Sequence, residues 1–349
     1  MARRSYSLDA MRVICISSVF IAHINPYNSG LPEGQTLISG PILFAGGVAV
    51  HFFIMLSAFL AGMSYSKNIS NGYAAYAKKR ALRLLPLNMV LMPFYLIVLC
   101  GFGFISFSWG STIAQFILSS FLMQELLKFS SMSLNSPAWT ISTLFILYLL
   151  TPILIRPFQR IKNVWVLLLI IVALTLIDDE YRQWLMLQKP NNYWVSWSSP
   201  FNRLFTYLDG LALSCAAKLM VCPDCLRRHI SAIEVIVLGA LVYGFSLIGE
   251  SVKILYYLTP ILIVLCYLEE GFLTRGLAKT RIHKGAPYVY AFYMLHWLTV
   301  HLSIGICDKW LGIWGSMSKP ALAAVVMLTL VGTCLLSVLL YRYVEKRQW

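Results

Sequence analysis

Apolar residues occur along this chain in long runs, and short polar or basic segments separate each run from the next. Many runs approach the roughly 20 residues that a helix needs to cross the hydrocarbon core of a bilayer. The pattern predicts an all-α fold, a polytopic transmembrane helix bundle. The eleven runs lie at residues 7–25, 43–64, 84–107, 111–127, 138–155, 163–178, 201–220, 231–248, 252–268, 286–305 and 318–341.

Lys and Arg residues in the connecting segments indicate which runs cross, because cytoplasmic loops carry an excess of these residues. They gather before the first run, in four later segments and after the last run; the four segments are 65–83, 156–162, 218–230 and 269–285. If all of these lie inside, both termini are cytoplasmic and an even number of crossings separates successive basic segments. The result is about ten spans, with one run that does not cross.

Run 111–127 is the weakest of the eleven, because it contains Gln115, Gln124 and Glu125. We expect it to be an interfacial or re-entrant helix. A segment of this kind at membrane depth must be surrounded by protein or by water, since its polar groups find no partners in lipid.

Composition agrees with this interpretation. The 349 residues are 59% hydrophobic and only 12% charged, and the mean hydropathy is +0.72. The net charge of +14 could indicate nucleic acid. However, the basic residues follow the topology of the spans, so we expect membrane lipid as a partner and no nucleic acid. No linker, repeat or soluble domain is visible, and residues 1–349 are expected to form a single membrane domain.

The eight Cys residues mostly lie inside apolar runs, where a free thiol behaves as a small hydrophobic group. Cys222 and Cys225 form one CxxC pair, and His229 follows. A structural zinc ion takes four ligands, so we expect no metal site. The first run lacks a small-residue cleavage site and is expected to remain as the first span.

The first run holds Asp9, Arg12 and His23 in or beside one apolar helix. Arg12 and His23 are eleven residues apart, so they project from nearly the same face, roughly 16 Å apart along the axis. Ionisable side chains in a membrane usually face the bundle interior or a cavity. A His can remove a proton from a hydroxyl group, and an Arg can hold an anion or a carboxylate. The alternative is that Arg12 snorkels to the inner interface while His23 caps the outer end.

The next two runs carry further polar residues. Ser57 lies in the second run beside small residues that allow close helix packing, and His51 in the same run is expected to be structural. Lys79, Arg80 and Arg83 lie at the cytoplasmic start of the third span, where a helix N-terminus with several cations can bind phosphate. Ordinary positive-inside charge explains the same residues.

Taken in order, these segments resemble the motifs of the membrane-bound acyltransferase-3 family, which includes bacterial sugar and polysaccharide O-acetyltransferases. No single motif is specific, but seven in family order extend over nearly the whole chain. The segments that resemble the family are SLDAMRVICISSVFIAH, HFFIMLSAFLAG, KKRALRLLP, SPAWTISTLFILYLLTP, RLFTYLDGLAL, YVYAFYMLHW and LLYRYVEKR.

The resemblance implies transfer of an acyl group, most often acetyl, from cytoplasmic acetyl-CoA to a hydroxyl group of a glycan or lipid-linked sugar across a bacterial inner membrane. His23 would be the general base, with Arg12 and Asp9 orienting or neutralising. Lys79, Arg80 and Arg83 would bind the donor. Ser57, Trp139, Ser142, Arg203, Tyr293 and His296 would line the cavity, and the outer aromatic residues Trp184, Tyr193, Trp194 and Trp197 could stack on sugar rings.

The chain departs from the family pattern at several positions. Leu144 and Phe145 stand where the family has an acidic pair, so an acid role there is in doubt. Lys346 and Gln348 stand where the closing motif has its final residues, including a Pro. These differences suggest a divergent subgroup.

Two other classes of function remain open from the residues. A transporter or flippase for a lipid-linked glycan or small solute would use polar residues inside a bundle equally well. Inverted repeats would favour that class, and none is visible. A membrane receptor or scaffold would not require Arg12 and His23 on one stripe.

Overall fold

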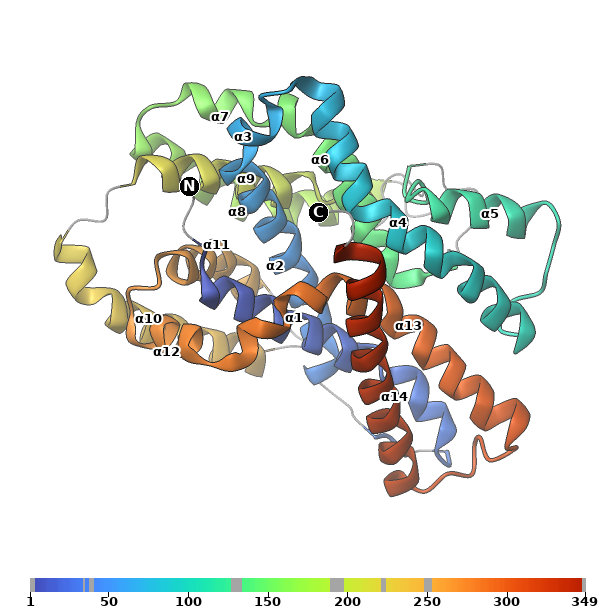
Figure 1. The fold of residues 1–349 in the computed structure, drawn as a ribbon. Coiled ribbons are helices and arrows are strands. Elements are labelled where there is room, and N and C mark those ends of the chain that lie inside the picture. The colour runs from blue at the N-terminus through green and yellow to red at the C-terminus, as the bar shows by residue number, and fades with distance from the viewer. Residues whose placement is uncertain are drawn as a thin grey trace. The chain divides into compact units, whose positions relative to one another are not determined.

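The computed structural model describes residues 4–33, 35–37, 41–126, 134–188, 198–220, 224–247 and 253–346. Most residues in these ranges are helical, and none of the residues within them forms a strand (Figure 1). The predicted all-α class is therefore confirmed. Some expectations lie outside the described residues: those for Tyr193, Trp194, Trp197, Cys222 and Gln348.

The described residues form the following helices in chain order. Their bounds are α1 Tyr6–Ala22, η1 Asn25–Gly30, α2 Pro41–Met63, α3 Tyr65–Ile69, α4 Gly72–Gly101, α5 Ser111–Ser120, η2 Ser136–Ala138, α6 Trp139–Leu154, α7 Arg156–Arg160, α8 Val164–Gln188, α9 Leu204–Leu219, α10 Asp224–Ser246, α11 Lys253–Leu268, α12 Phe272–Lys279, η4 Arg281–Tyr288, α13 Val289–Gly305, η5 Ile306–Trp310, α14 Lys319–Leu340 and η6 Tyr341–Glu345.

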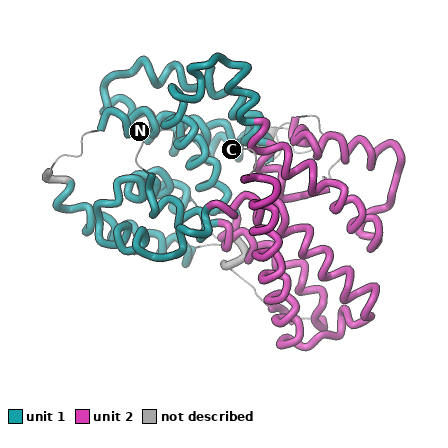
Figure 2. Tube along the Cα trace, viewed as in Figure 1, with its two compact units in different colours: residues 1–15, 47–80, 143–286 teal, residues 16–46, 81–142, 287–349 magenta. Residues whose placement is uncertain are grey.

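Two compact units make up the chain, and each is assembled from separate stretches of sequence (Figure 2). Unit 1 comprises residues 1–15, 47–80 and 143–286, and unit 2 comprises residues 16–46, 81–142 and 287–349. The first two boundaries between the units fall inside helices, after residue 15 in α1 and after residue 46 in α2.

Unit 1 is built around a close approach of α2 and α9. A Cβ atom on Gly210 of α9 would lie 2.3 Å from the carbonyl oxygen of Met55 and 2.7 Å from Cβ of Ala58. Gly62 of α2 is similarly close to Ser214 of α9. Small residues thus allow the two backbones to pack together, as expected for the small residues beside Ser57 in the second run.

We expect Gly210→Ala to destabilise unit 1, because the added methyl group overlaps a backbone oxygen that cannot move without moving α2. Overpacking of this kind costs about 1–3 kcal/mol. Gly239→Ala in α10 is the matched control, since nothing lies within 4 Å of its Cβ position. Thermal unfolding of detergent-solubilised protein should show a lower melting temperature for the first variant only; equal melting temperatures would contradict this packing.

Unit 2 is held together by buried tyrosines whose hydroxyl groups bridge separate elements. Tyr95 of α4 donates to the carbonyl oxygen of Met294 at 2.9 Å and accepts from the amide of Leu298 at 3.0 Å, both on α13. Tyr27 of η1 lies 2.6 Å from the hydroxyl of Ser303 and donates to Thr329 of α14 at 3.0 Å. These bonds satisfy polar groups that lipid could not.

Within the described residues, seven helical segments are long and apolar enough to cross a membrane, or eight if the bent pair of α11 and α12 counts as one. The sequence predicted about ten spans. The difference arises at α8 and α9, which match expected spans 163–178 and 201–220. α9 has only 16 residues, and α8 carries Asp178, Asp179, Glu180 and Arg182 in its second half.

The weak run 111–127 forms α5, a helix of ten residues that is too short to cross, followed by a turn. The turn is enclosed by protein, as its depth requires. Asn88 of α4 donates to the carbonyl oxygens of Ser119 and Ser120 at 2.6 and 2.9 Å, and Ser142 of α6 donates to that of Leu122 at 2.7 Å.

Candidate active site

His23 and His296 meet in unit 2. His23 is the residue that follows α1, and His296 lies in the middle of α13. Nδ1 of His23 is 3.3 Å from Nε2 of His296, and the ring centroids are 5.0 Å apart. His296 is fully buried, whereas His23 is partly exposed. The pair therefore consists of an enclosed imidazole and one that can be reached.

The hydrogen-bond partners of this pair determine where each ring carries its proton. A neutral imidazole has one N–H group and one lone pair. Nδ1 of His296 lies 2.6 Å from the carbonyl oxygen of Tyr293, which can only accept, so Nδ1 carries the hydrogen and Nε2 carries the lone pair.

The same reasoning then applies to His23. Its Nδ1 faces Nε2 of His296 at 3.3 Å and the carbonyl oxygen of Val19 at 2.9 Å, and both are acceptors. Nδ1 of His23 therefore carries the hydrogen. Nε2 keeps its lone pair and makes no hydrogen bond within the described part of the chain. This is the arrangement that a general base requires, with the second ring nitrogen fixed by its neighbours.

Aromatic rings enclose the histidine pair. The Trp297 ring packs edge-on against His23 at 5.2 Å, and Phe292 stacks parallel to His296 at 6.3 Å. Phe20, one turn before His23, contacts Phe292 at 5.8 Å. The two imidazoles are therefore flanked by aromatic side chains of α1 and α13.

Three residues predicted to line the cavity are also in unit 2, and all are buried. Tyr293 donates to the carbonyl oxygen of Pro137 at 2.5 Å, and Ser142 holds the turn after α5. Trp139 begins α6. The two hydroxyl groups thus have backbone partners in the fold, and the role of all three residues toward a substrate stays a prediction.

Asp9 and Arg12 lie in unit 1 and form an ion pair at 3.3 Å. Asp9 also pairs with Arg4 at 2.9 Å. One buried carboxylate therefore joins two cations at the start of α1. His23, at the other end of α1, belongs to unit 2, and a role for Arg12 and Asp9 beside it stays a prediction.

Arg80 of α4 is buried between two tyrosine rings of unit 1. Its guanidinium carbon lies 5.2 Å from the ring centroid of Tyr76 and 4.7 Å from that of Tyr148. One terminal nitrogen of Arg80 is buried without a hydrogen-bond partner among the described residues. An Arg that is stacked in this way is preorganised to bind an anion such as phosphate.

The structure corrects one part of the phosphate-site prediction. α4 begins at Gly72, so Lys79, Arg80 and Arg83 lie two to three turns inside the helix and not at its N-terminus. The dipole at the helix end therefore does not act on a ligand held there. Lys79 is exposed and donates to Asn68 at 3.0 Å, and Arg83 is exposed in unit 2.

Ser57 and Arg203, the last predicted cavity residues, are in unit 1. Ser57 is half-buried on α2, and Arg203 is buried at the residue before α9. Neither lies in the same unit as the histidine pair.

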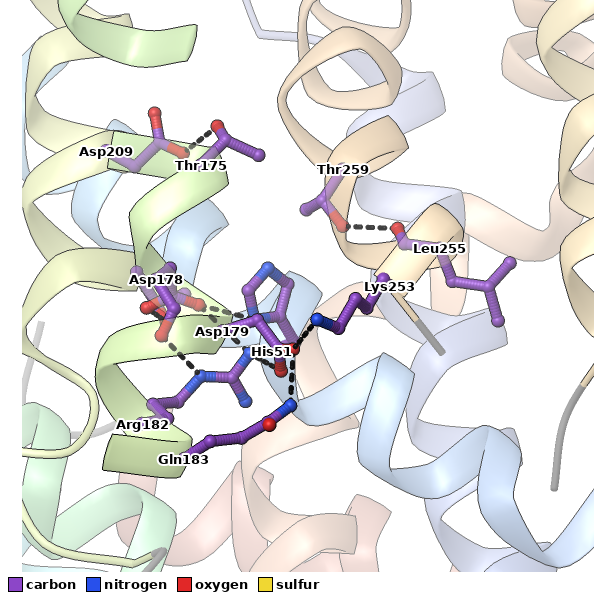
Figure 3. A network of polar contacts seen from close by, with 11 residues as sticks. His51, Thr175, Asp178, Asp179, Arg182, Gln183, Asp209, Lys253, Leu255 and Thr259 are labelled. Atoms are coloured by element: carbon purple, nitrogen blue, oxygen red, sulfur yellow. Dashed lines mark hydrogen bonds and ion pairs between the residues drawn. The ribbon is translucent and has the colours of Figure 1, made fainter. Parts of the chain in front are cut away.

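A second buried polar cluster in unit 1 was not predicted as a site (Figure 3). Arg182 of α8 pairs with Asp178 at 3.1 Å and with Asp179 at 3.3 Å. Asp178 also accepts from Thr206 of α9 at 2.9 Å and lies 3.8 Å from Nδ1 of His51 on α2. His51 was expected to be structural, and it lies at this junction of three helices.

The sequence contained a signal for this cluster. Asp178 and Arg182 are four residues apart, the spacing of an ion pair on one helix face, and they directly follow an apolar run. A charged pair that directly follows an apolar run indicates a buried network of ion pairs. The expected span 163–178 ends at this pair.

Among the described residues, no group of three or more His, Cys, Asp or Glu side chains could hold a metal ion. The cysteine pair at 222 and 225 lies partly outside those residues. The expectation of a metal-free enzyme thus stays a prediction.

A family model described as an acyltransferase domain, acyltransferase-3, matches residues 5–342. The chain belongs to this family of membrane acyltransferases. Searches of curated proteins and of solved structures find no match. The resemblance of the seven motifs is thereby confirmed at the level of the family. For this acyltransferase, the base-like Nε2 of His23 is the feature most directly suited to acyl transfer.

Proposed function

We propose that this acyltransferase moves an acetyl group from acetyl-CoA, on the cytoplasmic side of a bacterial inner membrane, to a hydroxyl group of a glycan or lipid-linked sugar. Both termini would be cytoplasmic. The observation that carries the proposal is the histidine pair, in which His296 fixes the tautomer of His23 and leaves Nε2 as the acceptor of a proton.

The chemistry that follows is a direct transfer. Nε2 of His23 takes the proton of the acceptor hydroxyl as its oxygen attacks the thioester carbonyl. The carbon–sulfur bond then breaks, and the thiolate of CoA leaves and takes the proton from His23. The products are the sugar ester and free CoA, and His23 is neutral again. Each turn therefore consumes no net proton.

Arg80 supports the assignment of a CoA donor. CoA carries phosphate groups, and an Arg stacked between two tyrosines with an unsatisfied N–H group offers both charge and geometry for one of them. The three cations of α4 that were expected to bind the donor are thus not equivalent, since Lys79 and Arg83 are exposed and Arg80 is buried. Arg80 is the one that we assign to the donor.

The proposed activity can be tested directly. Membranes that contain the protein should transfer label from isotopically labelled acetyl-CoA to an endogenous glycan, identified by mass spectrometry as an added acetyl ester. Membranes from a deletion strain should not. A transporter or flippase would instead change the distribution of the glycan and leave no acetyl ester, so that result would contradict the proposal.

In the same assay, Arg80→Lys should raise the KM for acetyl-CoA about tenfold, because Lys cannot stack or fork in the same way. The KM for the acceptor should stay unchanged. Lys67→Gln is the control, since Lys67 is an exposed cation of the preceding helix α3. An unchanged KM for acetyl-CoA in the Arg80 variant would refute the donor assignment.

A further inference from the structure

The segment from Phe272 to Tyr288 has no role in the proposed reaction, yet its charge is unusual. It contains Arg275, Lys279, Arg281 and Lys284 and no acidic residue. All four cations are exposed, and none forms an ion pair within the described part of the chain. The segment comprises helix α12 and the 3-10 helix η4, and all four cations lie in unit 1.

α12 is fixed to the body of unit 1 by a buried carboxylate. Glu234 of α10 accepts hydrogen bonds from the amides of Leu273 and Thr274 at 2.6 and 3.1 Å, and from the hydroxyl of Thr274 at 2.5 Å. These bonds satisfy the first amides of α12 and set its orientation. A Cβ atom on Gly271 would overlap the Glu234 carboxyl group, so the contact is close.

The two acidic residues just before α12 are also occupied. Glu269 accepts from the amide of Ser7 at 2.7 Å and from the hydroxyl of Ser5 at 2.9 Å. Glu270 pairs with Arg227 at 3.0 Å. The carboxylates near this segment thus bind elsewhere in unit 1, and the cations of the segment are not neutralised by them.

The exposed residues of α12 form one helix face. Phe272, Arg275, Gly276 and Lys279 are spaced at i, i+3, i+4 and i+7 and are all exposed, while Thr274 on the opposite side is buried. Phe272 is 72% exposed, which is costly in water for a ring of this size.

η4 continues the same surface with exposed Arg281, Ile282 and Lys284. It is anchored to α1, because the ring of His283 lies 4.8 Å from that of Tyr6. A Cβ atom on Gly285 would lie 3.1 Å from Val13. The surface is therefore part of the fold of unit 1 and not a loose loop.

We propose that this basic surface (Phe272, Arg275, Lys279, Arg281, Ile282 and Lys284) binds the headgroups of anionic phospholipids. The cations match lipid phosphates, and the two exposed apolar side chains can enter the acyl boundary, as in interfacial amphipathic helices. The position supports lipid over a soluble anion. α12 follows the apolar helix α11 after a bend of 64°, so the surface begins where a candidate span ends.

The experiment uses purified full-length protein in detergent micelles, with a fluorescent phosphatidylglycerol as the probe and phosphatidylcholine as the neutral comparison. The test variant replaces Arg275, Lys279, Arg281 and Lys284 by Gln. Each charge contributes about fivefold, so binding of phosphatidylglycerol should fall by more than about 100-fold. Binding of phosphatidylcholine should not change.

The matched control replaces four other exposed cations of unit 1 by Gln, namely Lys67, Lys78, Arg156 and Arg160. It should retain the binding of phosphatidylglycerol. A similar loss in both variants would mean general charge attraction and would overturn the proposal, as would full retention in the test variant.

Two further arms decide between lipid and a soluble phosphate. Phe272→Ser should weaken binding of the lipid probe severalfold, because it removes the apolar anchor while keeping the charge. Free CoA should not displace the probe from the unaltered protein. Displacement by CoA, or an unchanged Phe272 variant, would assign the surface to soluble anions instead. Because none of these readouts needs acyl transfer, the result is independent of the proposed function.

Discussion

Replacing His23 by Gln should reduce acyl transfer at least 100-fold while leaving membrane expression unchanged. The loss follows because removal of a positioned general base usually costs 10²–10⁴-fold. Gln keeps a hydrogen-bond donor beside Val19 but has no nitrogen lone pair that can accept a proton. Initial rates of label transfer from acetyl-CoA provide the measurement. A variant with more than a tenth of the parental rate would rule out His23 as the base.

The structure adds a sharper version of this test at His296. His296→Phe removes the acceptor for the Nδ1–H group of His23, so we expect kcat to fall roughly tenfold with little change in either KM. His296→Gln should recover part of the loss, because the amide oxygen can accept the same hydrogen bond. A purely structural role would predict no such rescue.

His301→Gln is the control for both histidine variants. His301 lies on the same helix α13, and its ring packs on Trp297 and Phe104 at 4.5 and 4.8 Å. Among the described residues it makes no hydrogen bond or ring contact with His23. Its replacement should leave kcat within about twofold. A large loss there would mean that the aromatic packing around α13, and not proton transfer, limits the reaction.

Replacing Arg182 by Met should have the largest effect on stability. Met keeps an unbranched apolar side chain, but it leaves the buried Asp178 carboxylate without its cation, and breaking a buried pair costs about 3–5 kcal/mol. The expected readout is a melting temperature several degrees below that of the parent in detergent, measured by a thiol-reactive dye or by tryptophan fluorescence.

The double variant Asp178→Asn, Arg182→Met should recover much of this loss, since no uncompensated charge remains. Glu180→Gln is the control, because the Glu180 side chain is 66% exposed and, among the described residues, its ion pair is with Lys253 at the surface. If the single and double variants melt at the same temperature, the cluster in Figure 3 is not held together by this ion pair.

Local sequence information was sufficient for the class of the protein and for much of its order along the chain. Apolar runs of span length cannot be buried in a soluble domain, so they required a helix bundle in a membrane whatever the contacts between helices. The polar residues of run 111–127 likewise predicted a segment that does not cross. The family also followed from the order of seven short motifs, which depends on no contact.

The sequence did not predict where a helix begins when that depends on which side chains are exposed. The third span was expected to begin near its first apolar residues, whereas α4 begins at Gly72. Lys78 and Lys79 are exposed on this helix, so their charges do not oppose its formation. The number of spans differs because α8 carries four charged residues in its second half and α9 has only 16 residues. The buried carboxylate of Asp178 on α8 finds partners on α2 and α9, and these cannot be seen from the α8 segment alone.

The sequence by itself thus determined that this is a polytopic membrane acyltransferase with His23 as a candidate base. Only the tertiary structure decided which ring nitrogen of His23 carries the hydrogen, because its partner His296 lies far along the chain. The tautomer also depends on the carbonyl oxygens of Val19 and Tyr293. The same holds for the buried Asp178 network. Contacts between distant segments form only when helices pack, and they set the chemistry of the groups that composition and spacing can merely locate.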